Sequence, residues 1–361
     1  PSNGEILGMA SYPTFNLNDP RKLTGMYTDE EIKDMSDEEY RNNLYSLWTN
    51  YCVSESYEPG STFKPVTVAS ALEEGVVKDG DTYVCKGFET VADYKLKCHV
   101  FSTIGSHGSL TVEQALMNSC NPYMIHLALE MGNSRFAYYQ SLFGFGKITG
   151  IDLPGETTGI VYGDRMTTID AACNSFGQTI NVNMMQMMAA YCSIINGGML
   201  YQPHIVKRIE SANGEVVKEY KANLVRQTIT ASTSKLLRRY LKNTVEEGTA
   251  KKAGVTGYSV AGKTGTAQKG DRKDNKWIIS FIGHAPAENP KFAIYVVIDE
   301  PYGTTGTSGS SADVLTLTHN ILEKLLPYMN VYKDASDEYE DTSSSPDELT
   351  VDGIPAGTAS S

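Results

Sequence analysis

The chain of 361 residues lacks any apolar run approaching the roughly 18 residues that a membrane-spanning helix requires. It also lacks an excess of basic residues, because 31 Lys and Arg stand against 43 Asp and Glu and give a formal net charge of −12. No basic stretch interleaved with aromatic residues is present, so nothing favours a nucleic-acid partner. Internal repeats are also missing, which excludes solenoid and propeller architectures.

The acidic residues are unevenly distributed along the chain. Residues 334–361 contain eight acidic residues and no basic residue, and they show no apolar periodicity. We therefore predict one large domain over residues 1–333, followed by a disordered acidic tail over residues 334–361. Apolar residues make up 40% of the chain, which is enough for the large domain to bury a sizeable core.

The pattern of apolar residues predicts both strands and helices. Strands are expected at residues 4–13, 259–268, 277–284 and 291–299, and helices at 61–75, 111–116, 122–129, 180–198 and 312–326, with a polar, helix-containing insertion at 16–50. Strands near both ends of the chain around central helices predict an α/β (α+β) fold with an antiparallel sheet covered by helices. Because the first strand starts almost at once and no signal peptide precedes it, we expect the chain to begin inside a longer protein.

Three short motifs occur in one order: Ser61-Thr62-Phe63-Lys64, Ser119-Cys120-Asn121 and Lys263-Thr264-Gly265-Thr266. Together they supply a nucleophile, an amine that handles protons, a bridging hydroxyl and a receptor for a carboxylate, which is the set that serine acyl transfer needs. Lys64 follows Ser61 by three residues, so on a helix the amine can reach the hydroxyl. Burial beside a second cation, Lys263, would lower the pKa of Lys64 and allow it to act as a base.

Two other segments match parts of these motifs. Ser232-Thr233-Ser234-Lys235 fits the first and Ser211-Ala212-Asn213 fits the second, but they occur in the reverse order. Asn213-Gly214 indicates a hairpin turn, and Ser232 precedes a helical pattern, where hydroxyls are typical of caps. Such structural roles are the simpler account of any single motif, so the inference depends on all three motifs and their flanks.

The flanking residues extend the pattern and identify a family. They comprise Glu58 to Lys64, Asn118 to Pro122, Gly144 to Gly146, Thr149 to Glu156 and Ala261 to Ala267. With them, the chain from about Gly4 to Leu326 resembles the transpeptidase domain of class B penicillin-binding proteins. The resemblance implies a penicillin-binding transpeptidase or serine β-lactamase-like fold for residues 1–333, with a helical subdomain beside the sheet.

The resemblance also implies a reaction, the D,D-transpeptidase step of peptidoglycan synthesis. Ser61 would attack a D-alanyl-D-alanine carbonyl, expel the last D-alanine and pass the acyl group to an amine of a neighbouring stem peptide. Ser119 would relay the proton to the leaving amine, and Asn121 would hold the substrate backbone. β-Lactams would inhibit the enzyme by acylating the same serine.

The third motif would bind the end of the substrate. Lys263 and the hydroxyls of Thr264 and Thr266 would hold the terminal carboxylate, and Gly265 would let the peptide approach an edge strand. The backbone N–H groups of Ser61 and Thr266 would form the oxyanion hole.

Partners and location follow from the same resemblance. We expect stem peptides as donor and acceptor, a membrane glycosyltransferase as partner through N-terminal regions missing from this chain, and no organic cofactor. The protein is expected at the extracytoplasmic face of the cell membrane, anchored by an upstream segment. Two alternatives stay open: a D,D-carboxypeptidase or β-lactamase, and a β-lactam sensor or inactive scaffold that binds penicillin without turnover. No Glu-x-x-Leu-Asn string is present, which disfavours a class A β-lactamase.

Four further residues form a candidate metal site: Cys85, Cys98, His107 and Cys120, spaced by 13, 9 and 13 residues. Three cysteines and one histidine are a common tetrahedral set for structural zinc. His107 and Cys120 resemble zinc ligands of elongation-type relatives, in which aspartates often occupy the two earlier positions. Thiolates can replace these carboxylates as zinc ligands.

A disulfide and free thiols are alternatives to zinc at these residues. Cys85 and Cys98 could form a disulfide in an extracytoplasmic chain, and Cys120 could be a buried apolar thiol. His99 could replace His107 as a ligand, although it is adjacent to Cys98. The other three cysteines lie in apolar or helical surroundings and are predicted to be packing residues; they are Cys52, Cys173 and Cys192.

Overall fold

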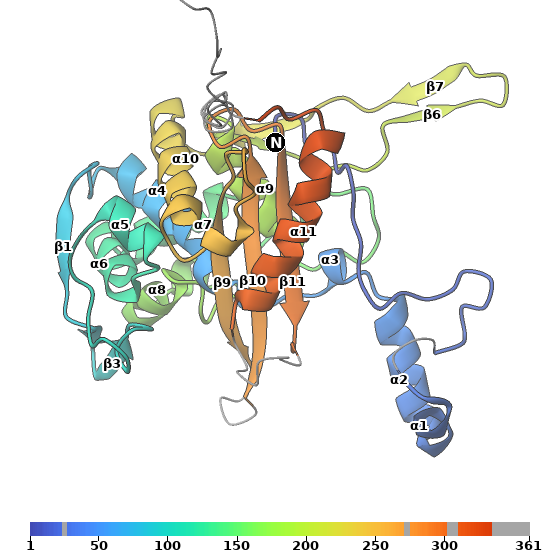
Figure 1. The fold of residues 1–361 in the computed structure, drawn as a ribbon, viewed down its shortest axis with the longest axis horizontal. Helices are drawn as coiled ribbons and strands as arrows, with labels where there is room; N and C mark the ends of the chain where they lie inside the picture. The colour runs from blue at the N-terminus through green and yellow to red at the C-terminus, as the bar shows by residue number, and fades with distance from the viewer. Residues whose placement is uncertain (24–26, 271–274, 302–309, 334–361) are drawn as a thin grey trace, which may run out of the picture.

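A three-stranded antiparallel sheet lies at the centre of the computed structural model, which describes residues 1–23, 27–270, 275–301 and 310–333 (Figure 1). In the order β11-β10-β9, its strands are β9 (Ala261–Lys269), β10 (Lys276–Ala285) and β11 (Phe292–Asp299). They confirm the three strands predicted near the C-terminal end. Residues 278–285 of the central strand β10 are buried on both faces, which explains their nearly continuous apolar sequence.

Helices cover both faces of this sheet. On one face, α11 (Ala312–Tyr328) packs against β10 and β11, with its Val314 and Leu322 in the same buried cluster as Ile279 and Phe281. On the other face, α9 (Met184–Ile195) contacts β11 and α10 (Ala231–Glu246) contacts β9. The strand alternation therefore divides β10 between two cores, which confirms the predicted sheet covered by helices.

A further group of helices forms a subdomain beside the sheet (Figure 1). These helices are α4 (Lys64–Glu74), α5 (Val112–Met117), α6 (Asn121–Met131), α7 (Asn133–Leu142) and α8 (Thr168–Asn174), with the 3₁₀ turn η2 (Gly163–Arg165). The 3₁₀ turn η1 (Gly60–Phe63) precedes α4 and contacts β9, the short helix α3 (Tyr51–Ser54) contacts α9, and the 3₁₀ turn η3 (Lys251–Ala253) contacts α10 and α11. Gly75 ends α4 in the left-handed conformation, and Thr111 forms a capping box with Gln114 at the start of α5, as their sequences predict.

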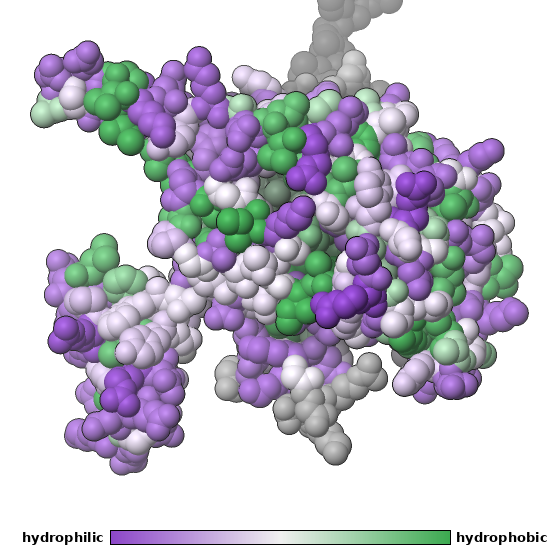
Figure 2. Space-filling view, turned by 180° about the vertical axis from the view of Figure 1, so that it is seen from behind, coloured by the Kyte–Doolittle hydropathy of each residue, from purple (hydrophilic) through white to green (hydrophobic). Residues whose placement is uncertain are grey.

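Two segments project from one side of the body (Figures 1 and 2). One is an arm of α1 (Asp29–Asp34) and α2 (Asp37–Trp48), which corresponds to the predicted polar insertion. The other is a hairpin of β6 (Arg208–Glu210) and β7 (Val216–Glu219), so the chance match at Ser211 is a turn. The other short strand pairs are β1 (Thr82–Cys85) with β4 (Gly108–Thr111), β2 (Phe88–Val91) with β3 (Tyr94–Lys97), and β5 (Met199–Tyr201) with β8 (Leu224–Gln227).

The predicted first strand at residues 4–13 is wrong. This segment makes only one parallel bridge, between Glu5 and His204, and the side chains of Leu7 and Tyr12 are 67% and 88% exposed. A short alternation of apolar residues forms a strand only when a neighbouring strand lies alongside it. In this segment only Glu5 has a bridge partner, so no strand forms. The predicted tail at residues 334–361 lies outside the described residues.

Within the described ranges, no helix combines the length and the apolar character that crossing a bilayer would require. The second chance match, Ser232 to Lys235, lies in the first turns of α10. Thr230 is the N-cap of that helix, and its hydroxyl accepts a hydrogen bond from the backbone N–H of Thr233. The predicted helix is therefore present, but its cap is Thr230, and Ser232 and Ser234 lie inside the first turns instead of capping them.

A buried histidine joins the sheet to α9. His284 in β10 is fully buried, its Nδ1 lies 2.8 Å from the Tyr191 hydroxyl and its Nε2 lies 3.1 Å from the carbonyl oxygen of Ala287. A carbonyl only accepts, so Nε2 carries the proton and Nδ1 accepts from Tyr191. Burial lowers the pKa of His284 to about 3.

We expect this histidine to make the fold sensitive to acid. Because its pKa is lower in the folded chain than in the unfolded chain, its contribution is complete above about pH 6.5 and is lost as the pH falls toward 3. The His284→Gln variant should therefore lose up to about 1.4 kcal/mol per pH unit from the pH slope of the free energy of unfolding between pH 6.5 and 4.5. Denaturant unfolding measures the slope, with the partly exposed His126→Gln as control. Equal slopes in His284→Gln and the wild type would contradict this prediction.

Candidate active site

The first motif forms the junction between a 3₁₀ turn and a helix. Ser61 is half-buried in η1, and Lys64 is the first residue of α4 and is fully buried. Pro65 follows in the first turn of α4. Proline is tolerated there because N–H groups in the first turn make no hydrogen bond within the helix. The chain therefore places Ser61 one turn before the buried amine, on the positive end of the helix.

The second motif contacts the amine of the first. Lys64 Nζ donates to the carbonyl oxygen of Ser119 at 2.6 Å, to its Oγ at 3.0 Å and to Oδ1 of Asn121 at 2.7 Å. Ser119 lies between α5 and α6 and has a left-handed φ of 56°, which is unusual for a residue other than glycine. Strain of this kind persists where surrounding contacts stabilise the conformation. Here the conformation directs both the carbonyl oxygen and the hydroxyl of Ser119 toward the amine of Lys64.

The third motif contacts the turn that carries Ser61. A side-chain carbon added at Gly60 would lie 2.6 Å from the carbonyl oxygen of Thr266, and one added at Gly265 would lie 2.8 Å from that of Pro59. These approaches leave no room for a side chain, so β9 and η1 meet backbone to backbone. The N–H groups of Ser61 and Thr266 thus belong to two segments in direct contact.

Two lysines are buried in this site. Burial lowers the pKa of Lys64 to about 8, and the nearby thiols Cys98 and Cys120 partly offset this effect. Burial also lowers the pKa of Lys263 far below its usual range, and the charge of Lys64 lowers it further. The repulsion between the two cations therefore lowers the pKa of Lys263, whereas we expected it to lower the pKa of Lys64. Lys263 Nζ donates to the carbonyl oxygen of Thr264 at 3.3 Å.

A loop that the sequence did not single out supports the same turn. The N–H of Gly60 donates to the carbonyl oxygen of Gly177 at 2.9 Å, and a side chain at Gly177 would lie 2.0 Å from the oxygen of Gly60. Thr179, two residues after Gly177, has a φ of 60°, and the side chain of buried Asn174 donates to its hydroxyl at 2.9 Å. The N–H of Thr179 donates to Glu58 at 2.9 Å, so the loop holds both sides of Pro59.

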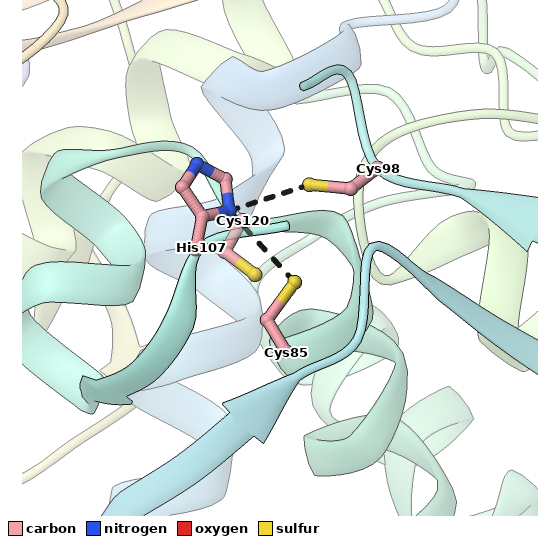
Figure 3. A group of neighbouring side chains, drawn as sticks. All are labelled: Cys85, Cys98, His107 and Cys120. Atoms are coloured by element: carbon pink, nitrogen blue, oxygen red, sulfur yellow. Dashed lines mark hydrogen bonds between the residues drawn. The ribbon is translucent and has the colours of Figure 1, made fainter. Parts of the chain in front are cut away.

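The four predicted metal ligands converge on one point (Figure 3). The Sγ atoms of Cys85, Cys98 and Cys120 and the ring nitrogen of His107 all lie within 4.8 Å of one another. His107 Nδ1 lies 3.8 Å from the Sγ of Cys85 and 3.5 Å from that of Cys98. His99 instead lies with its Nε2 3.0 Å from the carbonyl oxygen of Asn118. The geometry therefore favours His107 over His99.

Local structure brings these ligands together. Cys85 ends β1 opposite Gly108 in β4, next to His107, and its Sγ accepts from the N–H of Gly87 at 3.4 Å. Cys120 is the N-cap of α6 and lies between Ser119 and Asn121. All six cysteines are free thiols. Three thiols and one imidazole around a common centre fit the tetrahedral coordination of zinc, directly behind the second motif.

A serine one helical turn from a buried lysine, a second hydroxyl on that lysine and a glycine-containing edge strand beside both are typical of serine acyl transferases. A family model described as "Penicillin binding protein transpeptidase domain" matches residues 1–323. The chain therefore belongs to the penicillin-binding protein transpeptidase family, which confirms the resemblance found in the sequence.

Individual relatives agree with this family. The chain is 39% identical to Stage V sporulation protein D of Bacillus subtilis, over 92% of this chain and 48% of that protein. It is 31% identical to peptidoglycan D,D-transpeptidase FtsI of Escherichia coli, over 92% of this chain and 51% of that protein. The chain thus spans about half the length of the curated relatives it matches.

Solved structures share the fold. A D,D-transpeptidase domain from Eggerthella lenta matches with a TM-score of 0.77 and 27% identity, over 91% of this chain and 76% of that one. Penicillin-binding protein 3 of Mycobacterium tuberculosis, solved with aztreonam, matches with a TM-score of 0.71 and 29% identity, over 79% and 65% of the two chains. The α/β penicillin-binding fold predicted from the sequence is therefore confirmed.

The backbone contact at Gly177 leads to a stability prediction. The Gly177→Ala variant should lose about 3 kcal/mol of the free energy of unfolding, because the new methyl group meets the oxygen of Gly60 and the backbone has a φ of 79°. Gly214→Ala is a matched control with a φ of 85° and nothing within 4 Å of the added carbon. It should lose only about 1 kcal/mol. Urea unfolding compares the two, and equal losses would show that the backbone contact does not matter.

Proposed function

We propose that this chain is the catalytic domain of a peptidoglycan D,D-transpeptidase. One observation carries the proposal: the fully buried amine of Lys64 lies one turn from Ser61 and within 3.0 Å of the Ser119 hydroxyl and the Asn121 amide oxygen. Such a lysine has no structural ion-pair partner among these contacts and is costly to bury, so its position is explained by proton transfer. The name of the Escherichia coli relative, which states this activity, supports the proposal.

The first half of the reaction forms an acyl-enzyme. Lys64 Nζ in its neutral form takes the proton of Ser61 Oγ as that oxygen bonds to the D-alanyl carbonyl carbon. The carbonyl oxygen becomes an oxyanion that accepts from the N–H groups of Ser61 and Thr266, each contributing roughly 3 to 4 kcal/mol to transition-state stabilisation. The carbon–nitrogen bond then breaks, and the D-alanine amine leaves with a proton relayed through Ser119.

The second half transfers the acyl group. An amine of a neighbouring stem peptide attacks the ester carbonyl, its proton returns through Ser119 and Lys64, and Ser61 leaves with its hydroxyl restored. During the first half Lys263, Thr264 and Thr266 bind the terminal carboxylate of the donor, which leaves the site with the released D-alanine. A β-lactam follows only the first half, because its ring opens without losing a leaving group from the site.

The substrates and location are part of this proposal. The donor and acceptor are peptidoglycan stem peptides, and β-lactams are covalent inhibitors, in line with the relative solved with aztreonam. Because its substrate is peptidoglycan, the domain would act on the extracytoplasmic face of the cell membrane. It would be attached there through a segment upstream of Pro1. That segment would also bring it to a membrane glycosyltransferase, which supplies the glycan strands.

We further propose that Cys85, Cys98, His107 and Cys120 hold a structural zinc ion. The close approach of one histidine nitrogen and three sulfur atoms supports this set over a Cys85–Cys98 disulfide, which would leave Cys120 and His107 without a role. Four protein ligands leave no open position, so the ion would supply no catalytic water. Its effect would be to hold Cys120, and with it Ser119 and Asn121, against the loop that contains Cys98.

Labelling with a fluorescent penicillin tests the nucleophile. Wild-type protein should form a covalent adduct, and Ser61→Ala should form none, because Ser61 supplies the attacking hydroxyl and Ser119, whose hydroxyl also contacts Lys64, only relays protons. The control is Ser232→Ala, which removes the serine of the chance match and should be labelled at the wild-type rate. An adduct that survives Ser61→Ala would contradict the assignment.

The same protein separates the remaining alternatives when it is given a stem-peptide donor and an acceptor amine. Cross-linked product indicates a transpeptidase, and free D-alanine without cross-links indicates a carboxypeptidase. Rapid release of hydrolysed penicillin indicates a β-lactamase, and a stable penicillin adduct without any peptide product indicates a sensor or scaffold.

Metal analysis and melting test the zinc ion. The purified domain should contain about one zinc per chain, and a strong chelator should lower its melting temperature by several degrees. Cys120→Ser should lose the metal, whereas Cys192→Ser, which removes a cysteine outside the cluster, should retain it. Absence of zinc together with unchanged melting in chelator would disprove the site.

A further inference from the structure

A hydroxyl group on β11 connects the turn that carries Ser61 to the sheet. The Tyr295 hydroxyl lies 2.8 Å from the Tyr57 hydroxyl and 3.5 Å from Thr62 Oγ1, and the Ser280 side chain lies near it. Tyr57 lies just before the catalytic turn and Thr62 lies within it. Ser280 belongs to β10, where it pairs with Gly265 of β9.

The donors and acceptors in this group can be assigned from their partners. Thr62 Oγ1 donates to the carbonyl oxygen of Pro59 at 2.7 Å, so it must accept from Tyr295. Tyr57 donates to Tyr295. Tyr295 therefore makes two hydrogen bonds, with Tyr57 just before the catalytic turn and with Thr62 inside it, and it also lies near Ser280 of β10. Burial raises the pKa of Tyr57 well above its usual value, so its hydroxyl stays a donor.

The same atoms set the contact between η1 and β9. A carbon added at Gly265 would lie 2.4 Å from Ser280 Oγ, 2.8 Å from the Pro59 oxygen and 2.9 Å from Thr62 Cγ2. Tyr295 thus binds Thr62 on one side of this backbone contact and lies near Ser280 on the other. Thr62 and Ser280 are each only 1% exposed, so water has little access to replace a lost bond.

We propose that Tyr295 is a positioning residue that sets the distance between the two N–H groups of the oxyanion hole, one on Ser61 and one on Thr266. This inference rests on the proposed acyl-transfer function. Tyr295 does not touch the substrate in this role. It acts through Thr62, which follows Ser61, and through Ser280, which lies behind Gly265. A displacement of about 1 Å in such a constellation is enough to reduce the rate about 100-fold.

The test is Tyr295→Phe, which removes the hydroxyl and keeps the ring. The acylation rate constant for a fluorescent penicillin should fall about 10-fold to 100-fold, while the dissociation constant of the initial noncovalent complex changes less than about 2-fold. An acylaminomethyl boronic acid, whose serine adduct places an oxygen in the oxyanion hole, should bind more weakly by a similar factor.

Tyr139→Phe is the matched control. Tyr139 is buried, whereas Tyr295 is partly buried, and the Tyr139 hydroxyl donates to Glu74 at 3.1 Å, far from the turn. Both variants should lose stability through an unpaired partner, but only Tyr295→Phe should slow acylation and weaken boronate binding. Equal acylation by the two variants would refute the positioning role. A wild-type protein that is neither acylated nor bound by the boronate would instead refute the proposed function itself.

A second pair of variants keeps the test decisive if Tyr295→Phe does not fold. Thr62→Ser retains the hydroxyl that accepts from Tyr295, whereas Thr62→Val removes it at similar size. Acylation should remain within about 3-fold of the wild type in Thr62→Ser and fall at least 10-fold in Thr62→Val. Equal rates in the two Thr62 variants would show that the hydrogen bond does not position the turn.

Discussion

The active site depends on backbone contact between three segments that are far apart in the sequence. Gly60 on the catalytic turn, Gly177 on the supporting loop and Gly265 on β9 meet at distances that exclude any side chain. Because the peptide groups touch directly, the N–H groups of Ser61 and Thr266 keep fixed positions relative to each other. The large core between the helices and the sheet supplies the packing that holds these contacts closed.

The surrounding residues carry several costs that a purely structural site would avoid. Two lysines are fully buried, and Ser119 and Thr179 have left-handed backbones that L-residues rarely adopt. Specific hydrogen bonds hold these residues, from Lys64 to Ser119, from Lys263 to Thr264 and from Asn174 to Thr179. Unfavourable conformations and buried charges beside one serine are expected where rigid placement serves chemistry, and the hydrophobic cores on both faces of the sheet offset them.

Local features were predicted well because each depends on neighbouring residues. The capping box at Thr111, the glycine that ends α4 and the turn at Asn213-Gly214 all involve contacts within about four residues. The strand predicted at residues 4–13 failed for the opposite reason, since a strand needs a partner that its own sequence does not specify. The contribution of Gly177 and Tyr295 was missed because both act across more than 100 residues of chain.

The order of the residues alone established which chemical groups are available: the serine, the two lysines, the hydroxyl and amide of the second motif, and three cysteines with one histidine. Their spacing and flanks were sufficient to identify the family. Folding in three dimensions established that Lys64 contacts Ser119 and Asn121, that burial and not a second cation lowers its pKa, and that His107 rather than His99 faces the thiols. Distances, burial and electric fields arise from packing, and packing joins segments whose separation along the chain carries no information about their separation in space.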